Sequence, residues 1–251
     1  MPFDGTLQRI ETTTTSRPNC GLCPAAPHCM IADMPHDAVS QWNALVQCHV
    51  SLAESGRTLF SEHDNATAIY VVRAGCVKSV TIDDEGNERV RAFHLPGDLV
   101  GLDALGVTRY PSSAVAVTAS QVCRVPKALV MQKIAESPVL AQRLLQRLSR
   151  DLAHSQAIAG DFNADQRVAA FLLNMQQRLN PLPGTPAKLP MSRGDIANYL
   201  RLATETVCRV LTRFAAKGLI ESEDRKIRFL KPAPLHALAQ PVGIVDMVAT
   251  A

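Results

Sequence analysis

Three cysteines stand close together near the start of this 251-residue chain, in the stretch "NCGLCPAAPHCM". Cys20, Cys23 and Cys29 have the spacing C-x2-C-x5-C. Thiolates bind soft metals, and a CxxC pair lets one loop supply two ligands, so this spacing indicates zinc or an iron-sulfur cluster completed by a fourth ligand. Catalysis by a thiol is the weaker interpretation, because no His with Asn or Asp accompanies the cysteines.

The composition limits what those cysteines belong to. With 47% apolar and 20% charged residues, the chain is typical of a globular protein long enough for two domains. No apolar run approaches the roughly 20 residues of a membrane span, and a signal-peptide pattern is absent. We therefore expect a cytoplasmic protein without membrane contact, where thiols stay reduced and a cysteine cluster binds metal rather than forming disulfides.

The net charge of +3 is unevenly spread along the chain. Residues 188–231 contain ten Lys and Arg against five Asp and Glu, so this part carries +5 and the rest carries −2. A basic C-terminal quarter indicates contact with a polyanion. The same excess also fits a solvated surface, and charge alone does not separate the two interpretations.

Hydrophobic periodicity indicates an α+β organisation. Residues 1–18 are polar and Thr-rich, and we expect them to be disordered. A weak helical pattern covers residues 37–50. From about residue 57 to residue 125, β-branched runs alternate with turn signals such as "DDEGN" and "PGD", which predicts an antiparallel sandwich or barrel.

A long helix is predicted after Ser137, which with Pro138 forms an N-cap and first turn. Leu145, Leu148 and Leu152 recur at spacings of three and four and form a narrow apolar stripe. A narrow stripe suits a partner helix and so indicates a homodimer. Leu140 and Leu144 widen it near the N-terminus, and they favour packing within the helix's own domain.

The basic region has the pattern of a helix, a short turn, a second helix and a wing. Ser192 and Asp195 have capping spacing at the first helix. The second helix is predicted to begin with Thr204 as N-cap and to end at Gly218. Its core side would consist of Val207, Val210, Leu211 and Phe214, and its outward side of Glu205, Cys208, Arg209, Thr212 and Arg213. Such a helix can enter a major groove.

These motifs together resemble the Crp/Fnr family of bacterial transcription regulators, and within it the oxygen-responsive FNR branch. The resemblance covers nearly the whole chain after residue 19. It rests on the cysteine spacing combined with Cys123, and on the stretches "FHLPGDLVGLDALG", "ADQRVAAFL" and "MSRGDIANYLRLATETVCRVL". It implies an N-terminal antiparallel β jelly roll of the cyclic-nucleotide-binding type, a long dimerisation helix and a C-terminal winged helix-turn-helix. The corresponding divisions are a tail of residues 1–18, a sensor domain of 19–136, the dimerisation helix of 137–160 and a DNA-binding domain of 161–251.

The resemblance also implies a function, and the function is not enzymatic. A 4Fe-4S cluster bound by Cys20, Cys23, Cys29 and Cys123 would sense oxygen and control dimerisation. The dimer would bind a TTGAT-like palindrome in double-stranded DNA, act with RNA polymerase and regulate anaerobic gene expression. Pro24 and His28, which lie between the cysteines, are expected to tune the stability of the cluster.

FNR-like regulators carry an E-x-x-S-R motif in the recognition helix, and here it is Glu205, Cys208 and Arg209. Glu205 can accept from a cytosine amino group, and Arg209 can engage guanine or phosphate. A thiol is a weaker hydrogen-bond partner than a hydroxyl, so the half-site preference at Cys208 is open. Further contacts with DNA are expected from Thr204, Arg193 and Arg213.

Other interpretations stay open at this point. Cys48 and Cys76 are expected to pack in the core. A regulator that binds zinc or a cyclic nucleotide is the alternative function, but Pro111, Ser112 and Ser113 stand where a phosphate-binding Arg is expected, and Arg109 is displaced by two residues. A metal-dependent enzyme or an electron carrier would have no use for a winged helix-turn-helix.

Overall fold

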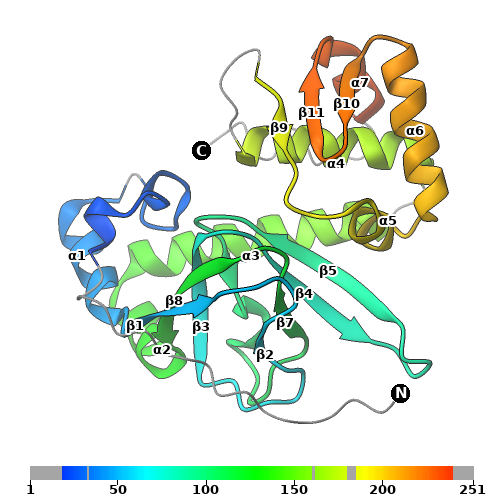
Figure 1. Ribbon diagram of the computed structural model, residues 1–251. Coiled ribbons are helices and arrows are strands. Elements are labelled where there is room, and N and C mark those ends of the chain that lie inside the picture. The colour runs from blue at the N-terminus through cyan, green and yellow to red at the C-terminus, as the bar shows by residue number, and fades with distance from the viewer. Residues whose placement is uncertain (1–18, 33, 160–161, 180–184, 240–251) are drawn as a thin grey trace. The chain divides into compact units, whose positions relative to one another are not determined.

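The computed structural model describes residues 19–32, 34–159, 162–179 and 185–239. The tail predicted to be disordered, residues 1–18, lies outside the described residues. The chain divides into two compact units, one of Met1–Thr81 with Pro96–Leu140 and one of Ile82–Leu95 with Ala141–Ala251. The first is mainly β and the second mainly helical (Figure 1), which confirms the α+β class.

Two four-stranded antiparallel sheets form the predicted β jelly roll, which is called the β-roll below. In chain order the strands are β1 (Cys48–Leu52), β2 (Thr58–Phe60), β3 (Ala68–Ala74), β4 (Val77–Ile82), β5 (Glu88–His94), β6 (Leu99–Val100), β7 (Ser113–Ala116) and β8 (Ser120–Pro126). One sheet has the order β1-β8-β3-β6 and the other the order β2-β7-β4-β5. β-branched and aromatic side chains from both sheets bury one shared core, as their alternation along each strand predicts.

Two parts of the first unit differ from the sequence prediction. The predicted helix at 37–50 is too long, because α1 (His36–Leu45) ends early and Cys48–Leu52 pair with β8 as a strand. No helix is predicted at α2 (Lys127–Glu136), of which only Val130 is buried. A helix that buries so little of its surface shows no apolar stripe in the sequence.

The second unit consists largely of helices with one small sheet. Besides β5, it contains α3 (Pro138–Ala159) from Ala141 onwards, α4 (Ala164–Leu179), β9 (Ala187–Lys188), α5 (Arg193–Leu200), α6 (Thr204–Ala216), β10 (Ile220–Glu223), β11 (Lys226–Phe229) and α7 (Pro232–Ala239). The predicted wing hairpin is confirmed as β10 and β11, and β9 adds an unpredicted third strand beside β11. Leu140 N donates to Ser137 Oγ at 3.4 Å, as expected for a cap at the start of α3.

The segment Ile82–Leu95, which contains β5, packs within the second unit through Asn198 of α5. Val90 N donates to Asn198 Oδ1 at 2.8 Å, and Asn198 Nδ2 donates to Glu88 O at 2.6 Å. One amide side chain thus satisfies a donor and an acceptor of β5, as a neighbouring strand would. Beside this contact, the ring of Phe93 packs against Phe171 and Tyr199, with centroids 6.3 and 5.2 Å away.

Candidate functional site

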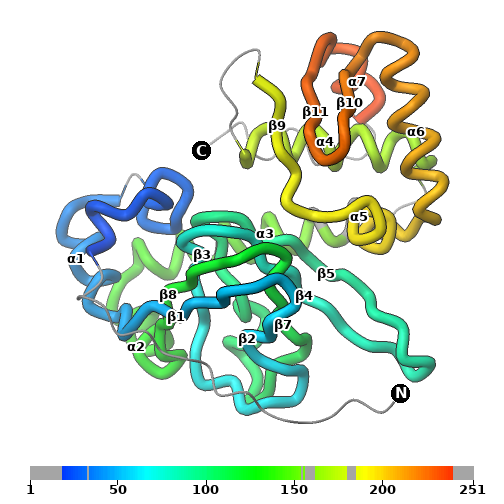
Figure 2. Tube along the Cα trace, in the orientation of Figure 1, coloured from blue at the N-terminus to red at the C-terminus, as the bar shows by residue number. Residues whose placement is uncertain are grey.

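The cysteine loop is a series of tight turns held against α1, and Figure 2 traces it beside that helix. Cys20–Leu22 and Ala26–His28 each form one turn of 3-10 helix. Asn19 caps the first turn through Gly21 N at 3.1 Å, and Cys20 N donates to Asn43 Oδ1 of α1 at 2.9 Å. Hydrogen bonds of this kind explain how a loop without a hydrophobic core of its own can hold three thiols in fixed positions.

Cys123 reaches the same site from the centre of a sheet. It lies on β8, where its register partners are His49 of β1 and Val71 of β3. Cys20, Cys23, Cys29 and Cys123 line one cavity of about 320 Å³, counted with its open mouth. Most of the other lining side chains are apolar, among them Trp42. The predicted ligand set, separated by about a hundred residues in the sequence, is thus brought together.

Burial and mutual proximity shift the ionisation of these thiols. Burial raises the pKa of Cys20 to about 11, with smaller contributions from Cys29 and Cys23. Burial also raises the pKa of Cys123 to about 12, and the three loop cysteines add to it. Without a metal, Cys20 and Cys123 therefore keep their protons at neutral pH, and a bound metal must displace those two protons.

Four thiols around one cavity can hold either of two kinds of metal group. A zinc ion needs all its sulfurs about 2.3 Å from one point. In an iron-sulfur cluster each cysteine binds its own iron, so the four sulfurs stand farther apart. Among the residues that the structure describes, no three His, Cys, Asp or Glu side chains are arranged to hold a single metal ion.

Gly97 supports the cysteine loop through a close backbone contact. Its φ is +95°, and a Cβ at this position would lie 2.3 Å from His28 O and 2.8 Å from Cys29 N. Gly97 N donates to Val72 O at 2.8 Å, so the turn is fixed to β3. The backbone before Cys29 therefore rests on a turn that has no room for a side chain.

Gly97→Ala is expected to displace the His28–Cys29 backbone and abolish metal retention, while the β-roll still folds. Gly86→Ala is the matched control, because Gly86 has a similar φ of +82° and nothing within 4 Å of its Cβ position. Left-handed backbone strain should cost each variant about 1–2 kcal/mol of unfolding free energy. Iron content and thermal unfolding of both variants measure the difference; equal iron content would contradict the expectation.

The two residues expected to tune the site lie outside the cavity. Pro24 and His28 are both exposed, and neither side chain belongs to the cavity lining. The cavity instead contains residues that the sequence pattern did not single out, notably Arg73 and Trp42. A lone arginine within the β-branched run "AIYVVRAG" was the available signal.

The helix-turn-helix forms as its caps predict, with one difference. Ser192 and Asp195 make a reciprocal capping box at α5, with Asp195 N donating to Ser192 Oγ at 3.0 Å. Gly218 has the expected left-handed φ of +64° after α6. The prediction of Thr204 as N-cap is wrong by one residue: Ala203 occupies the cap without a side-chain hydrogen bond, and Thr204 begins the helix. Boundaries of this kind depend on the entering turn rather than on residue preference.

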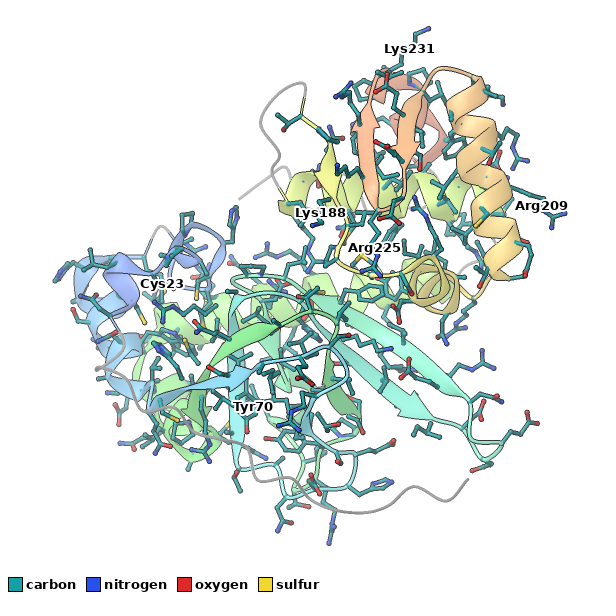
Figure 3. The ribbon with its side chains drawn as sticks, viewed as in Figure 1. Cys23, Tyr70, Lys188, Arg209, Arg225 and Lys231 are labelled. Carbon is teal, nitrogen blue, oxygen red and sulfur yellow. The ribbon has the colours of Figure 1, made fainter. Side chains whose placement is uncertain are left out.

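α6 has the two faces that its sequence predicts. Val207, Val210, Leu211 and Phe214 are buried, whereas Glu205, Cys208, Arg209, Thr212 and Arg213 are exposed. In Figure 3 the side chain of Arg209 projects away from the body of the unit. Glu205, Cys208 and Arg209 therefore lie on one accessible helix face, as direct base contacts require.

Two of the arginines expected at DNA make contacts inside the second unit. Arg193 Nη2 donates to Ser222 Oγ at 3.0 Å and also to Asp224 O, which attaches α5 to the wing. Arg213 forms an ion pair with Asp165 of α4, with Nε 3.2 Å from Oδ2. These guanidinium groups hold α5 and α6 in place, in addition to any contact with DNA.

The apolar stripe on α3 is exposed where a partner helix is expected. Leu145 is 63% exposed, Leu148 39% and Leu152 61%, whereas Leu140 and Leu144 are buried. The N-terminal end of the stripe packs within the chain, as predicted, and the remainder is exposed. Pairing of this exposed part with a partner helix stays a prediction.

Aromatic side chains pack in the interior of the β-roll. Phe60 stacks on Tyr110 with ring centroids 3.7 Å apart, and Tyr110 OH donates to Ala68 O at 2.6 Å. Arg109, which lies near the expected phosphate-binding position in the sequence, instead donates to His63 O at 2.7 Å from an exposed side chain. Among the described residues of the β-roll no Lys or Arg is buried, so a cyclic phosphate would find no buried cation there.

Two family models match successive parts of the chain. A cyclic nucleotide-binding domain matches residues 52–137, and a Crp-like helix-turn-helix domain matches residues 166–238. Among curated relatives, the transcriptional regulatory protein btr of Bordetella pertussis is 35% identical, with 94% of this chain and 98% of that protein covered. The chain belongs to the Crp/Fnr family.

Further relatives within this family are regulators of the FNR type. The transcriptional activator FnrA of Stutzerimonas stutzeri is 36% identical over 74% of this chain and 78% of its own length. The fumarate and nitrate reduction regulatory protein of Vibrio cholerae is 32% identical, with 88% and 90% covered. The structure of FixK2 from Bradyrhizobium japonicum superposes with a TM-score of 0.71 at 31% identity, covering 77% of this chain and 98% of that one.

Membership of this family shows the general class of activity. This Crp/Fnr protein is a DNA-binding transcription regulator and not an enzyme. No helix within the described parts of the chain is long and apolar enough to cross a membrane.

Proposed function

We propose that this regulator senses oxygen through a 4Fe-4S cluster held by Cys20, Cys23, Cys29 and Cys123. One observation carries the proposal, namely that four thiols from two distant segments line a single, mostly apolar cavity. When bound, the cluster would supply an oxygen-reactive group whose presence stabilises one state of the protein. The FNR-type relatives support this choice of cofactor over zinc.

The chain offers a physical route from the cavity to the helix that would dimerise. Trp42 of α1 lines the cysteine cavity, and it also lines a second, smaller cavity together with Ser137 and Leu140. Asn43 of the same helix accepts the hydrogen bond from Cys20 N. A change in the cysteine loop would therefore shift α1, and through it the first turn of α3.

The remaining parts of the proposal concern DNA. Pairing of two copies through Leu145, Leu148 and Leu152 would set two α6 helices on successive major grooves. Glu205, Cys208 and Arg209 would then contact the bases of a TTGAT-like palindrome, and the bound dimer would act with RNA polymerase on anaerobic genes in the cytoplasm. The β-roll buries no Lys or Arg among its described residues, which weighs against the alternative of a cyclic-nucleotide regulator.

Purification without oxygen tests the proposal directly. We expect a brown protein with about four irons and four sulfides per chain. It should run as a dimer and bind TTGAT-containing DNA more tightly than a scrambled duplex. Exposure to air should bleach the visible absorption and weaken both dimer and DNA binding. A colourless protein with stoichiometric zinc, or DNA binding indifferent to air, would refute the sensory function.

A further inference from the structure

Arg73 introduces a positive charge into the cysteine cavity. The cavity lining consists of four thiols and mainly apolar side chains, and among its described residues Arg73 is the one cationic side chain. Arg73 is half-buried at the end of β3. Burial of a cation beside apolar residues is costly unless an anion or a hydrogen-bond acceptor compensates it.

The register of β3 places Arg73 on the side of the sheet that carries Cys123. Val71 pairs directly with Cys123, so side-chain alternation along β3 puts Arg73, two residues later, on the same face. The cavity lining contains both residues. The ladder is irregular just at this point, because Val72 pairs with Val122 and Ala74 with Gln121, and β-bulges of this kind are common beside functional sites.

A hydrogen bond orients the guanidinium of Arg73 in the cavity. Arg73 Nη1 lies 3.1 Å from His49 Nδ1, and His49 is the direct register partner of Cys123 on β1. The bond uses one of the five N–H donors of the guanidinium. His49 of β1 thus orients the guanidinium of Arg73. Cys123 lies on β8, the strand between β1 and β3.

We propose that Arg73, placed by the register of β3 and oriented by His49, compensates the negative charge of the four-thiolate site. This inference rests on the proposed function, because it assumes that the thiolates hold a cluster. A cluster ligated by four thiolates is a net anion, and nearby charge is one of the factors that set its reduction potential. A guanidinium that lines the same cavity stabilises this negative charge, so Arg73 disfavours loss of an electron from the cluster.

Two substitutions separate the effect of the positive charge of Arg73 from the effect of the shape of its side chain. Arg73→Gln removes the charge, and Arg73→Lys retains it without the planar guanidinium. Arg124→Gln is the matched control, because Arg124 is a β8 residue whose side chain bonds Gln47 and Thr67 rather than lining the cavity. Each protein is prepared without oxygen, and its iron and sulfide content, midpoint potential and rate of bleaching in air are measured. The fluorescence of Trp42, the single tryptophan, reports whether the site is intact.

We expect Arg73→Gln to show a lower midpoint potential and to bleach about three- to tenfold faster than wild type. Arg73→Lys should stay close to wild type, and His49→Leu, which removes the acceptor, should fall between them. If Arg73→Gln loses iron outright, retention of iron by Arg73→Lys still supports the inference. Identical behaviour of Arg73→Gln and Arg124→Gln would overturn it, as would equal damage from both Arg73 substitutions. Absence of a cluster from the wild-type protein would instead overturn the proposed function itself.

Discussion

Cys123→Ala is expected to abolish cluster binding while leaving a folded protein. The substitution removes the one ligand that comes from the sheet, so the three loop cysteines would be left without a partner on β8. Iron and sulfide content should fall to background. DNA affinity under nitrogen should fall by about 100-fold, because two half-sites would no longer be bound as one linked pair. Iron analysis, visible spectra and DNA titration of the anaerobic protein measure these effects.

Cys76→Ala provides the matched control for that experiment. Cys76 is also a buried thiol, with no measurable exposure, but it lies before β4 and does not line the cavity. Both substitutions delete one buried sulfur and should cost about 1 kcal/mol of unfolding free energy. Only Cys123→Ala should lose the cluster. A Cys123→Ala protein that keeps its iron and its sensitivity to air would show that the fourth ligand lies elsewhere.

Leu152→Asp is expected to separate dimerisation from folding. Leu152 is 61% exposed on α3, so the monomer loses little when a carboxylate replaces it, and its unfolding free energy should change by no more than about 0.5 kcal/mol. In a two-fold symmetric dimer the substitution occurs twice at the interface. Burial of a leucine contributes about 1.5 kcal/mol or more, so the dimer dissociation constant should rise about 100-fold.

Sedimentation of the anaerobic, cluster-loaded protein measures that change, and Val139→Asp is the control. Val139 is an exposed apolar residue on the same helix, 44% accessible, but it lies away from the side of Leu145 and Leu152. We expect Val139→Asp to remain dimeric at concentrations where Leu152→Asp is monomeric. Weakened DNA binding with full cluster content in Leu152→Asp would place dimerisation downstream of the cluster. Unchanged dimer stability in this variant would exclude the stripe as the interface.

The DNA-binding half of the protein was largely predictable from its sequence. Short-range rules govern it: a capping box at Ser192, a left-handed glycine at Gly218 and a 3.6-residue period through Val207 and Phe214. Each rule involves residues that are close in sequence, so each leaves a readable pattern. The errors occurred where tertiary pairing overrides local preference, as at Cys48–Leu52, which β8 draws into a strand.

The sensor half depends more strongly on packing between distant segments. α2 was missed because it buries only Val130, so its sequence lacks a stripe. The support that Gly97 gives to His28 and Cys29 joins residues nearly seventy positions apart, and nothing in either local sequence reveals the contact. Resemblance to a family suggested Cys123 as a ligand, but spacing alone could not.

The sequence by itself determined that the candidate ligands are thiols, how three of the four are spaced, and which face of α6 is exposed. These properties depend on side-chain chemistry and on helical period, which are local. Only the tertiary structure decided that Cys123 and Arg73 face the same cavity, because that depends on the register of β8 between β1 and β3. Register is a property of paired strands, so no single stretch of sequence contains it.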